Sequence, residues 1–271
     1  TAAGLDKNGD YIDALGALGF GFLEVGTVTP RPQLGNPKPR VFRNFHENSI
    51  INRLGFNNKG IDYMVNNLKK RKFDGVVGVN IGANKSSEGI ERINDYLLCI
   101  EKIHKLADYI TINISSPNTP DLRDLHLKEN LQNLITSVEK KIDEVKFTKP
   151  VFLKISPDET DESIEMIVDL VNNSSFTGLI ATNTTIEKDN LSNKKLKNEA
   201  GGVSGQPLME KSTNKILLIR SKCPDIPLIG VGGVISKDDY ISKINAGADL
   251  VQIYTGFIIK GPDLINQILR D

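Results

Sequence analysis

Short apolar, β-branched segments recur along the whole chain, and segments with a helical repeat of apolar residues separate them. Nearly continuous apolar runs are typical of parallel strands that helices cover. If the opening residues 1–7 are the end of a strand, the sequence predicts eight strands. The other seven predicted strands cover residues 22–26, 75–80, 109–113, 150–154, 178–183, 227–231 and 249–254.

The segments between these strands have the pattern of amphipathic helices. Apolar residues recur about every 3.6 positions in 129–145 and again in 92–106. Ser236 and Asp239 have the spacing of a capping pair, and Gly247 is placed as a helix stop. Each predicted strand is therefore followed by a predicted helix.

Eight strand–helix units in roughly 250 residues predict a (β/α)8 barrel, with a doubly wound sheet as the alternative fold. The proline-rich segment 28–57 interrupts the alternation after the second strand. We interpret it as an inserted hairpin and loop, which at that end of a barrel covers the active site. Because no linker or repeat divides the chain, we expect one domain over residues 1–271.

Charge and cysteine content narrow the function. The 34 Lys and Arg residues balance the 34 Asp and Glu residues, so bulk charge cannot drive binding to nucleic acid or to an anionic membrane. No apolar run approaches the roughly 18 residues of a membrane span. Cys99 and Cys223 cannot form a disulfide framework or a zinc site, so we expect a reducing compartment and no metal site.

Polar residues gather where the predicted strands end, at the face where barrels carry their active sites. Amide groups both donate and accept hydrogen bonds, so this face suits a flat, neutral ligand such as a flavin ring or a pyrimidine. The residues at or just after the strand ends are Lys7, Thr27, Asn80, Asn113, Ser115, Ser116, Asn118, Lys154, Thr182, Asn183, Thr184, Tyr254 and Thr255.

Glycines 230, 232 and 233 follow the seventh predicted strand and precede a helix. Exposed backbone N–H groups beside a helix start bind anions, and barrels often hold a phosphate after strands seven and eight. The pattern therefore predicts a phosphate site, and a plain tight turn is the alternative.

Two side chains at this face are candidates for chemistry. Lys154 ends an apolar strand, so its ammonium should point into the barrel mouth, where a cation beside a flavin stabilises the reduced ring. Ser116 lies in the turn N-I-S-S-P-N-T and is a candidate base, or only a polar turn residue. No histidine is placed to activate it, which argues against a Ser-His-Asp hydrolase. Lys7 is a third candidate, unless it only pairs with Asp6 at the rim.

Ten motifs run from one end of the chain to the other in the order of a known family. They are A-A-G-L-D-K (2–7), G-T-V-T-P-R-P-Q-x-G-N-x-x-P-R (26–40), I-N-R-L-G-F-N (51–57), N-I-S-S-P-N-T-P-x-L-R (113–123), K-I-x-P-D (154–158), T-N-T-T (182–185), G-G-V-S-G-x-P-L (201–208), I-G-V-G-G (229–233), A-G-A-x-L-V-Q-I-Y-T-G (246–256) and K-G-P (260–262). With them the sequence resembles class 2, quinone-dependent dihydroorotate dehydrogenases, flavin enzymes of pyrimidine synthesis.

The resemblance implies an FMN across the barrel mouth, with dihydroorotate beside it. It places the catalytic base on Ser116 and assigns Lys154 to the flavin. The implied FMN contacts are Ala3, Gly4, Thr27, Asn80, Asn113, Lys154, Thr182, Gly205, Gly233, Tyr254 and Thr255. The implied substrate contacts are Lys7, Asn52, Arg53, Leu54, Gly55, Phe56, Asn113, Asn118, Asn183 and Thr184.

The resemblance also implies the reaction and where it takes place. Dihydroorotate becomes orotate, its hydride passes to FMN, and the electrons go to a membrane quinone. Ser116 is the class-discriminating residue, because class 1 relatives carry cysteine there, and residues 118–125 form a predicted lid over the substrate.

We expect peripheral membrane contact through an N-terminal segment that this sequence lacks, since the chain begins inside the predicted first strand. That contact would be at the cytoplasmic face of the inner membrane in a bacterium or at the mitochondrial inner membrane in a eukaryote. Two alternatives stay open: another FMN- or phosphate-binding barrel oxidoreductase with a class 1-like acceptor, and a non-catalytic flavin-binding module.

Overall fold

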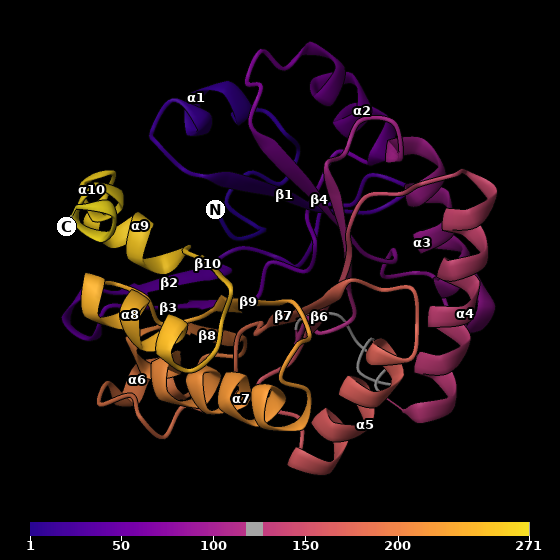
Figure 1. Ribbon diagram of the computed structural model, residues 1–271. Helices are drawn as coiled ribbons and strands as arrows, with labels where there is room; N and C mark the ends of the chain where they lie inside the picture. The colour runs from indigo at the N-terminus through magenta and orange to yellow at the C-terminus, as the bar shows by residue number, and fades with distance from the viewer. Residues whose placement is uncertain (118–126, 271) are drawn as a thin grey trace.

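Seven parallel strands curl into one sheet in the computed structural model, which describes residues 1–117 and 127–270 (Figure 1). Neighbouring strands pair in the order β1-β4-β5-β6-β7-β9-β10, and every pair in that sheet is parallel. The strands are β1 (Phe22–Val28), β4 (Val76–Ile81), β5 (Tyr109–Asn113), β6 (Val151–Ile155), β7 (Gly178–Ala181), β9 (Leu228–Val231) and β10 (Leu250–Gln252).

Residues 1–6 take the eighth place in the ring, but they do not form the regular strand that we predicted. The chain start lies between β1 and β10 (Figure 1). The Ala2 N–H donates to the Ile253 carbonyl at 3.0 Å, and the Gly4 N–H donates to the Gly26 carbonyl at 2.7 Å. The segment therefore bridges the two edge strands and completes a (β/α)8 barrel, as expected, with an irregular first element.

The helices lie outside the sheet and follow the strands as predicted (Figure 1). The predicted helices 92–106 and 129–145 correspond to α3 and α4, and Ser236 accepts a hydrogen bond from the Asp239 N–H at 3.1 Å as an N-cap. The helices are α1 (Ile12–Gly16), α2 (Ile61–Lys70), α3 (Gly89–Ile103), α4 (Lys128–Glu144), α5 (Asp161–Asn172), α6 (Lys194–Lys197), α7 (Met209–Lys222), α8 (Lys237–Asn245), α9 (Thr255–Lys260) and α10 (Asp263–Leu269), with short 3-10 turns at Phe45–Glu47 and Gln206–Leu208.

The insertion after β1 contains the predicted hairpin, formed by β2 (Val41–Asn44) and β3 (Ser49–Asn52). A third strand that we did not predict, β8 (Gly202–Gly205), pairs antiparallel with β3. Ser49 is the partner of Gly205 in this register. The hairpin and β8 therefore form an antiparallel three-stranded sheet. Within it, the paired strands β3 and β8 lie about 150 residues apart in the chain.

Strand β5 shows how side chains divide between the two faces of the barrel wall. Ile110 and Ile112 pack into the large apolar core between sheet and helices, whereas Tyr109, Thr111 and Asn113 belong to the other face. Successive side chains of a strand point to opposite faces. The barrel interior is thus partly polar, while burying each large aliphatic chain outside it stabilises the fold by roughly 1.5–3 kcal/mol.

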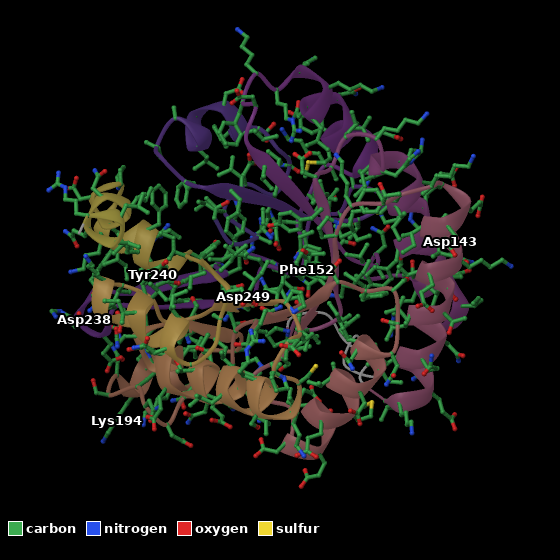
Figure 2. All side chains as sticks on the ribbon, in the orientation of Figure 1. Asp143, Phe152, Lys194, Asp238, Tyr240 and Asp249 are labelled. Atoms are coloured by element: carbon green, nitrogen blue, oxygen red, sulfur yellow. The ribbon has the colours of Figure 1, made fainter. Side chains whose placement is uncertain are left out.

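Most of the charged side chains lie on the outer surface. Figure 2 shows Asp143, Lys194 and Asp238 at the periphery, on or beside the outer helices, while Phe152 lies within the barrel. Within the described residues, every helix is too short or too polar to cross a lipid bilayer.

Candidate active site

A cavity of about 910 Å³, which includes space open to solvent, lies at the carboxyl ends of the barrel strands. The three-stranded sheet contributes Asn52, Ser204 and Gly205 to its wall. Most of the residues predicted to contact FMN or substrate line it: Ala3, Gly4, Lys7, Thr27, Asn52, Leu54, Gly55, Phe56, Asn113, Ser116, Lys154, Thr182, Asn183, Thr184, Gly205, Gly233, Tyr254 and Thr255.

Two of the described residues that were predicted as contacts, Asn80 and Arg53, are not in that wall. Asn80 is fully buried one layer below it, where its amide bonds Thr27 and Asn113. Arg53 turns outward instead, because its guanidinium pairs with Glu199 at 2.9 Å and covers the Phe42 ring at 4.6 Å. Asn118 and the predicted lid 118–125 lie outside the described residues.

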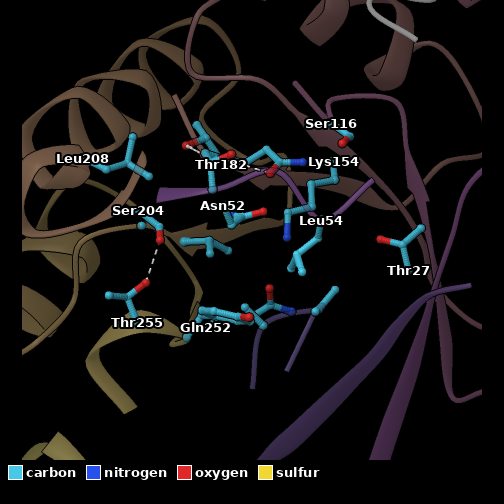
Figure 3. A pocket seen from close by; sticks show the side chains of 18 of the residues that line it. Thr27, Asn52, Leu54, Ser116, Lys154, Thr182, Ser204, Leu208, Gln252 and Thr255 are labelled. Carbon is cyan, nitrogen blue, oxygen red and sulfur yellow. Dashed lines mark hydrogen bonds between the residues drawn. The ribbon is translucent and has the colours of Figure 1, made fainter. Parts of the chain in front are cut away.

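Several wall residues were missing from the sequence prediction. Gln252 reaches the cavity from β10, and Ser204 bonds Thr255 at 2.8 Å across the wall (Figure 3). The sequence itself indicates Gln252 as a site residue, since it is a lone amide in the apolar run L-V-Q-I. No local pattern indicates that Ser204 lies in the cavity wall, because its position depends on the pairing of β8 with β3.

Two ammonium groups face this cavity, and neither forms a direct ion pair with a carboxylate in the described part of the chain. Lys154 is 5% exposed and extends into the cavity (Figure 3), and burial lowers its pKa while the negative charge of Glu24 raises it. Burial lowers the pKa of Lys7 to about 8, and repulsion from Arg40 adds to the effect. Because a buried cation needs an anionic or electron-rich partner, both groups fit a ligand with negative charge.

Side-chain amides form a connected network beside Lys154. The Asn113 amide nitrogen donates to Asn80 Oδ1 and to Thr27 Oγ1, each at 3.1 Å. Its oxygen accepts from the Ser115 hydroxyl at 3.2 Å, which in turn accepts from the Asn183 amide at 3.0 Å. Every amide is therefore held by others, so the edges that face a ligand are set before it binds.

The two serines of the N-I-S-S-P turn have different surroundings. Ser115 is fully buried and bonded to Asn113 and Asn183, so it belongs to the amide network. Ser116 is 5% exposed and lines the cavity. Of the two hydroxyls, that of Ser116 is therefore the one placed to meet a ligand.

The other end of the cavity is built from backbone. Gly232 and Gly233 have φ angles of 116° and 87°, and a Cβ on Gly233 would lie 2.4 Å from the Met209 Cα. This close packing sets the glycine loop directly on the start of α7. Only glycine fits there, which leaves the backbone itself to contact a ligand.

A buried cation lies beneath this glycine loop. Lys243 is 0% exposed, and its ammonium donates to Thr213 Oγ1 at 2.8 Å and to the Ser212 hydroxyl. Ser212 Oγ also lies 3.0 Å from the Gly232 carbonyl oxygen. Burial lowers the pKa of Lys243 to about 7, and the charge of Asp239 opposes that shift. A cation under a helix start favours an anion above it.

The model of the family described as dihydroorotate dehydrogenase matches residues 1–271. The chain belongs to the dihydroorotate dehydrogenase family. A Saccharophagus degradans relative, named dihydroorotate dehydrogenase (quinone), is 50% identical over 269 residues, which is 97% of this chain and 79% of that one. A Legionella pneumophila relative of the same name is 48% identical over 273 residues, covering 99% and 82% of the two chains.

Solved dihydroorotate dehydrogenase structures share the fold. The Eimeria tenella enzyme in complex with ferulenol superimposes with a TM-score of 0.92 at 35% identity, covering 98% of this chain and 78% of that chain. Its ligand-free form gives 0.92 at 36% identity, covering 98% and 80%. The predicted barrel and the resemblance to quinone-dependent dihydroorotate dehydrogenases are thereby confirmed, and enzymes of this family use a flavin.

Proposed function

We propose that this chain oxidises dihydroorotate to orotate in pyrimidine synthesis, with FMN as cofactor and a quinone as electron acceptor. The observation that carries the proposal is the cavity itself. It brings the buried Lys154 ammonium, the amides of Asn113 and Asn183, and the Ser116 hydroxyl to one barrel mouth. Family membership connects that set of groups to dihydroorotate chemistry.

The residues fit FMN at both of its ends. Gly232 and Gly233 leave backbone open to a phosphate, and Lys243 supplies positive charge behind them. Lys154, at the amide end, suits the pyrimidine part of the flavin ring. When bound, FMN supplies the hydride acceptor, and the Lys154 ammonium stabilises negative charge that develops on the ring.

The substrate contacts follow from the same geometry. Lys7 provides a cation for the carboxylate of dihydroorotate, and the Asn52, Asn113 and Asn183 amides match its ring amide edges. Ser116 accepts the C5 proton as the C6 hydride leaves. Because a serine hydroxyl is a weak base, a proton relay out of the site must support it. Much of the rate enhancement then comes from holding the substrate in register.

A second cavity of about 970 Å³ adjoins the first. Gly4, Lys7 and Tyr254 line both cavities, while Val41 and Ile50 of the hairpin line the second one alone. An acceptor could therefore come close to the flavin without displacing the substrate. Since quinones are lipid-soluble, we propose that the enzyme works at a membrane surface.

The test is an anaerobic titration of the FMN-loaded protein with dihydroorotate. The visible absorbance of oxidised flavin should disappear with one equivalent of substrate and should return on adding quinone but not fumarate. Fumarate as the better acceptor would support the class 1-like alternative. A flavin that dihydroorotate leaves oxidised would contradict the proposal and favour another barrel enzyme or a binding module.

Lys154→Met gives the residue-level version of this test. The variant should retain less FMN, or reduce it far more slowly, because no other described cation takes its place in the wall beside the amide network. Lys149→Met is the matched control, since Lys149 pairs with Asp108 at the protein surface. Equal behaviour of the two variants would remove Lys154 from the mechanism.

A further inference from the structure

We propose that Glu24 is a positioning residue for the substrate: from beneath the cavity, it sets the direction of the Asn80 amide, on which the Asn113 and Asn183 amides above it depend for a matching partner. This inference rests on the proposed function for the identity of the substrate. Glu24 lies on β1, is 0% exposed, and does not line the cavity. Its effect therefore has to pass through other side chains.

Glu24 is surrounded by hydrogen-bond donors from three other strands. The Asn80 amide reaches Oε1 at 2.8 Å, while the Tyr109 hydroxyl at 2.9 Å, the Thr111 hydroxyl at 3.1 Å and the Gln252 amide at 2.7 Å reach Oε2. A carboxylate only accepts hydrogen bonds. Each neighbour must therefore turn a donor toward Glu24, and an amide that turns its nitrogen there presents its oxygen on the other side.

Asn80 passes this constraint upward. Its nitrogen is committed to Glu24, so its oxygen faces the site, where it accepts from Thr27 Oγ1 at 2.6 Å and from the Asn113 nitrogen at 3.1 Å. If Asn80 were reversed, its oxygen would meet the Glu24 carboxylate and its nitrogen would meet the Asn113 nitrogen. Both contacts would be repulsive and buried.

Asn113 and Asn183 carry the direction to the cavity wall. With its nitrogen held by Asn80, Asn113 turns its oxygen toward the Ser115 hydroxyl, which donates to it at 3.2 Å. The Ser115 oxygen then accepts from the Asn183 nitrogen at 3.0 Å, and the Asn183 oxygen accepts from the Thr184 N–H at 2.8 Å. Backbone N–H groups favour the same directions at two points, since Ser115 N–H donates to the Asn113 oxygen at 3.2 Å and Thr184 N–H donates to the Asn183 oxygen. Glu24 sets the direction of Asn80, which must agree with these backbone donors for the whole chain of hydrogen bonds to form.

The same carboxylate is the negative charge that acts on Lys154. Burial lowers the pKa of Lys154, and Glu24 opposes that lowering. Glu24 therefore supports two features of the site that a planar anion with amide groups, such as orotate, requires. These are side-chain amides of defined direction and a charged ammonium.

The test exchanges the carboxylate and the amide between positions 24 and 80. The side-chain amide that Glu24→Gln introduces can both donate and accept, so the Asn80 amide loses its defined direction. Combining Glu24→Gln with Asn80→Asp restores the direction, because the carboxylate introduced by the second substitution can only accept and the Asn113 nitrogen must still donate. Tyr109→Phe is the control, since it removes a hydrogen bond to the same carboxylate without reversing any amide.

Orotate affinity of the FMN-loaded proteins, measured by calorimetry, is the readout, together with KM and kcat for dihydroorotate. Glu24→Gln should weaken orotate binding and raise KM by about tenfold or more. The double variant should return to within about threefold of the unmodified protein, and Tyr109→Phe should stay within about twofold of it. Rescue by the polarity exchange is the result that a merely structural role would not produce.

Two results would overturn the inference: equal orotate affinity in Glu24→Gln and Tyr109→Phe, or a folded double variant as weak as the single one. If Glu24→Gln does not fold, the double variant decides, since recovery supports the polarity argument and failure rejects it. If the unmodified protein itself is not reduced by dihydroorotate, the proposed function fails instead, which separates the two conclusions.

Discussion

The two ends of the cavity offer a ligand different kinds of contact. Near Asn113 and Lys154 the contacts are side chains held by one another and by Glu24. Near Gly232 and Gly233 they are backbone, and the buried Lys243 ammonium lies behind the wall. The first end can select a ligand by the pattern of its edges, whereas the second selects only by negative charge and close fit.

This difference predicts which function, substrate turnover or FMN binding, a substitution at each end should impair. Changes at the amide end, other than at Lys154, should impair substrate binding or chemistry while flavin stays bound. Changes at the glycine end should release FMN without altering the preference for orotate.

Ser116→Ala should give the largest loss, because it removes the proposed base. We expect turnover to fall by roughly 10²–10⁴-fold, with FMN and orotate still bound, as measured by stopped-flow flavin reduction and by calorimetry. Ser116→Cys keeps a group that can accept a proton and should recover part of the rate. Near-normal flavin reduction by the alanine variant would rule out Ser116 as the base.

Gly233→Ala tests the backbone end. The new Cβ would lie 2.4 Å from the Met209 Cα at a φ of 87°, so the loop must move, at a cost of about 1–3 kcal/mol. FMN affinity, measured by fluorescence quenching, should drop about 5- to 150-fold. The control is Gly261→Ala, whose φ of 70° is equally strained but whose Cβ meets nothing within 4 Å. If both variants bind FMN alike, the fit of the loop is not important.

Lys243→Met separates charge from shape at the same end. FMN affinity should fall about tenfold, equivalent to roughly 1.4 kcal/mol, while riboflavin, which has no phosphate, should bind as before. Lys237→Met, in the first turn of the same helix, is the control. Since the pKa of Lys243 is about 7, the preference for FMN should weaken as the pH rises above that value. Parallel loss of both flavins would mean that Lys243 only stabilises the fold.

Lys7 predicts a pH dependence at the amide end. Its pKa is lowered to about 8 by burial, so its charge is present below that pH and is lost above it. Orotate affinity should therefore decline several-fold as the pH rises through about 8, and Lys7 should take up a proton when orotate binds near that pH. Calorimetry in buffers of different ionisation enthalpy measures both effects. Lys7→Gln should bind weakly with no such slope, and an unchanged slope would assign the titration to another group.

Arg53→Ala should have the smallest effect. Sequence reasoning placed Arg53 against the substrate, but its guanidinium pairs with Glu199, and each side chain is about one quarter exposed. We expect unchanged orotate affinity and a loss of about 0–1 kcal/mol in the free energy of unfolding. A clear rise in the orotate dissociation constant would mean that Arg53 turns inward when substrate binds.

Much of the fold could be read from the sequence because strands and helices have local periods. The seven predicted strand positions and the helices over 89–103 and 128–144 follow from runs of apolar residues that need no knowledge of distant contacts. Most of the predicted contacts line one cavity because parallel strands place their carboxyl ends at one face. Their roles as contacts remain predictions.

The misses involve contacts between distant segments. Strand β8 exists because residues 202–205 meet β3, and no local pattern announces that pairing. The direction of the Arg53 side chain depends on where Glu199 lies after that pairing. Glu24 and Gln252 stand out in the sequence as polar residues in apolar strands. The hydrogen bond between them forms only because the barrel brings their strands together.

The sequence alone determined the alternation of strands and helices, and with it the barrel and the face that carries its polar strand ends. It did so because the spacing of apolar residues, which reflects the period and the buried face of each element, is a local property of the sequence. Only the tertiary structure decided that residues 1–6 close the ring without forming a regular strand, that Asn80 lies below the cavity wall, and that one carboxylate accepts hydrogen bonds from three other strands. Those outcomes depend on how the sheet closes on itself, which brings together groups from strands far apart in sequence.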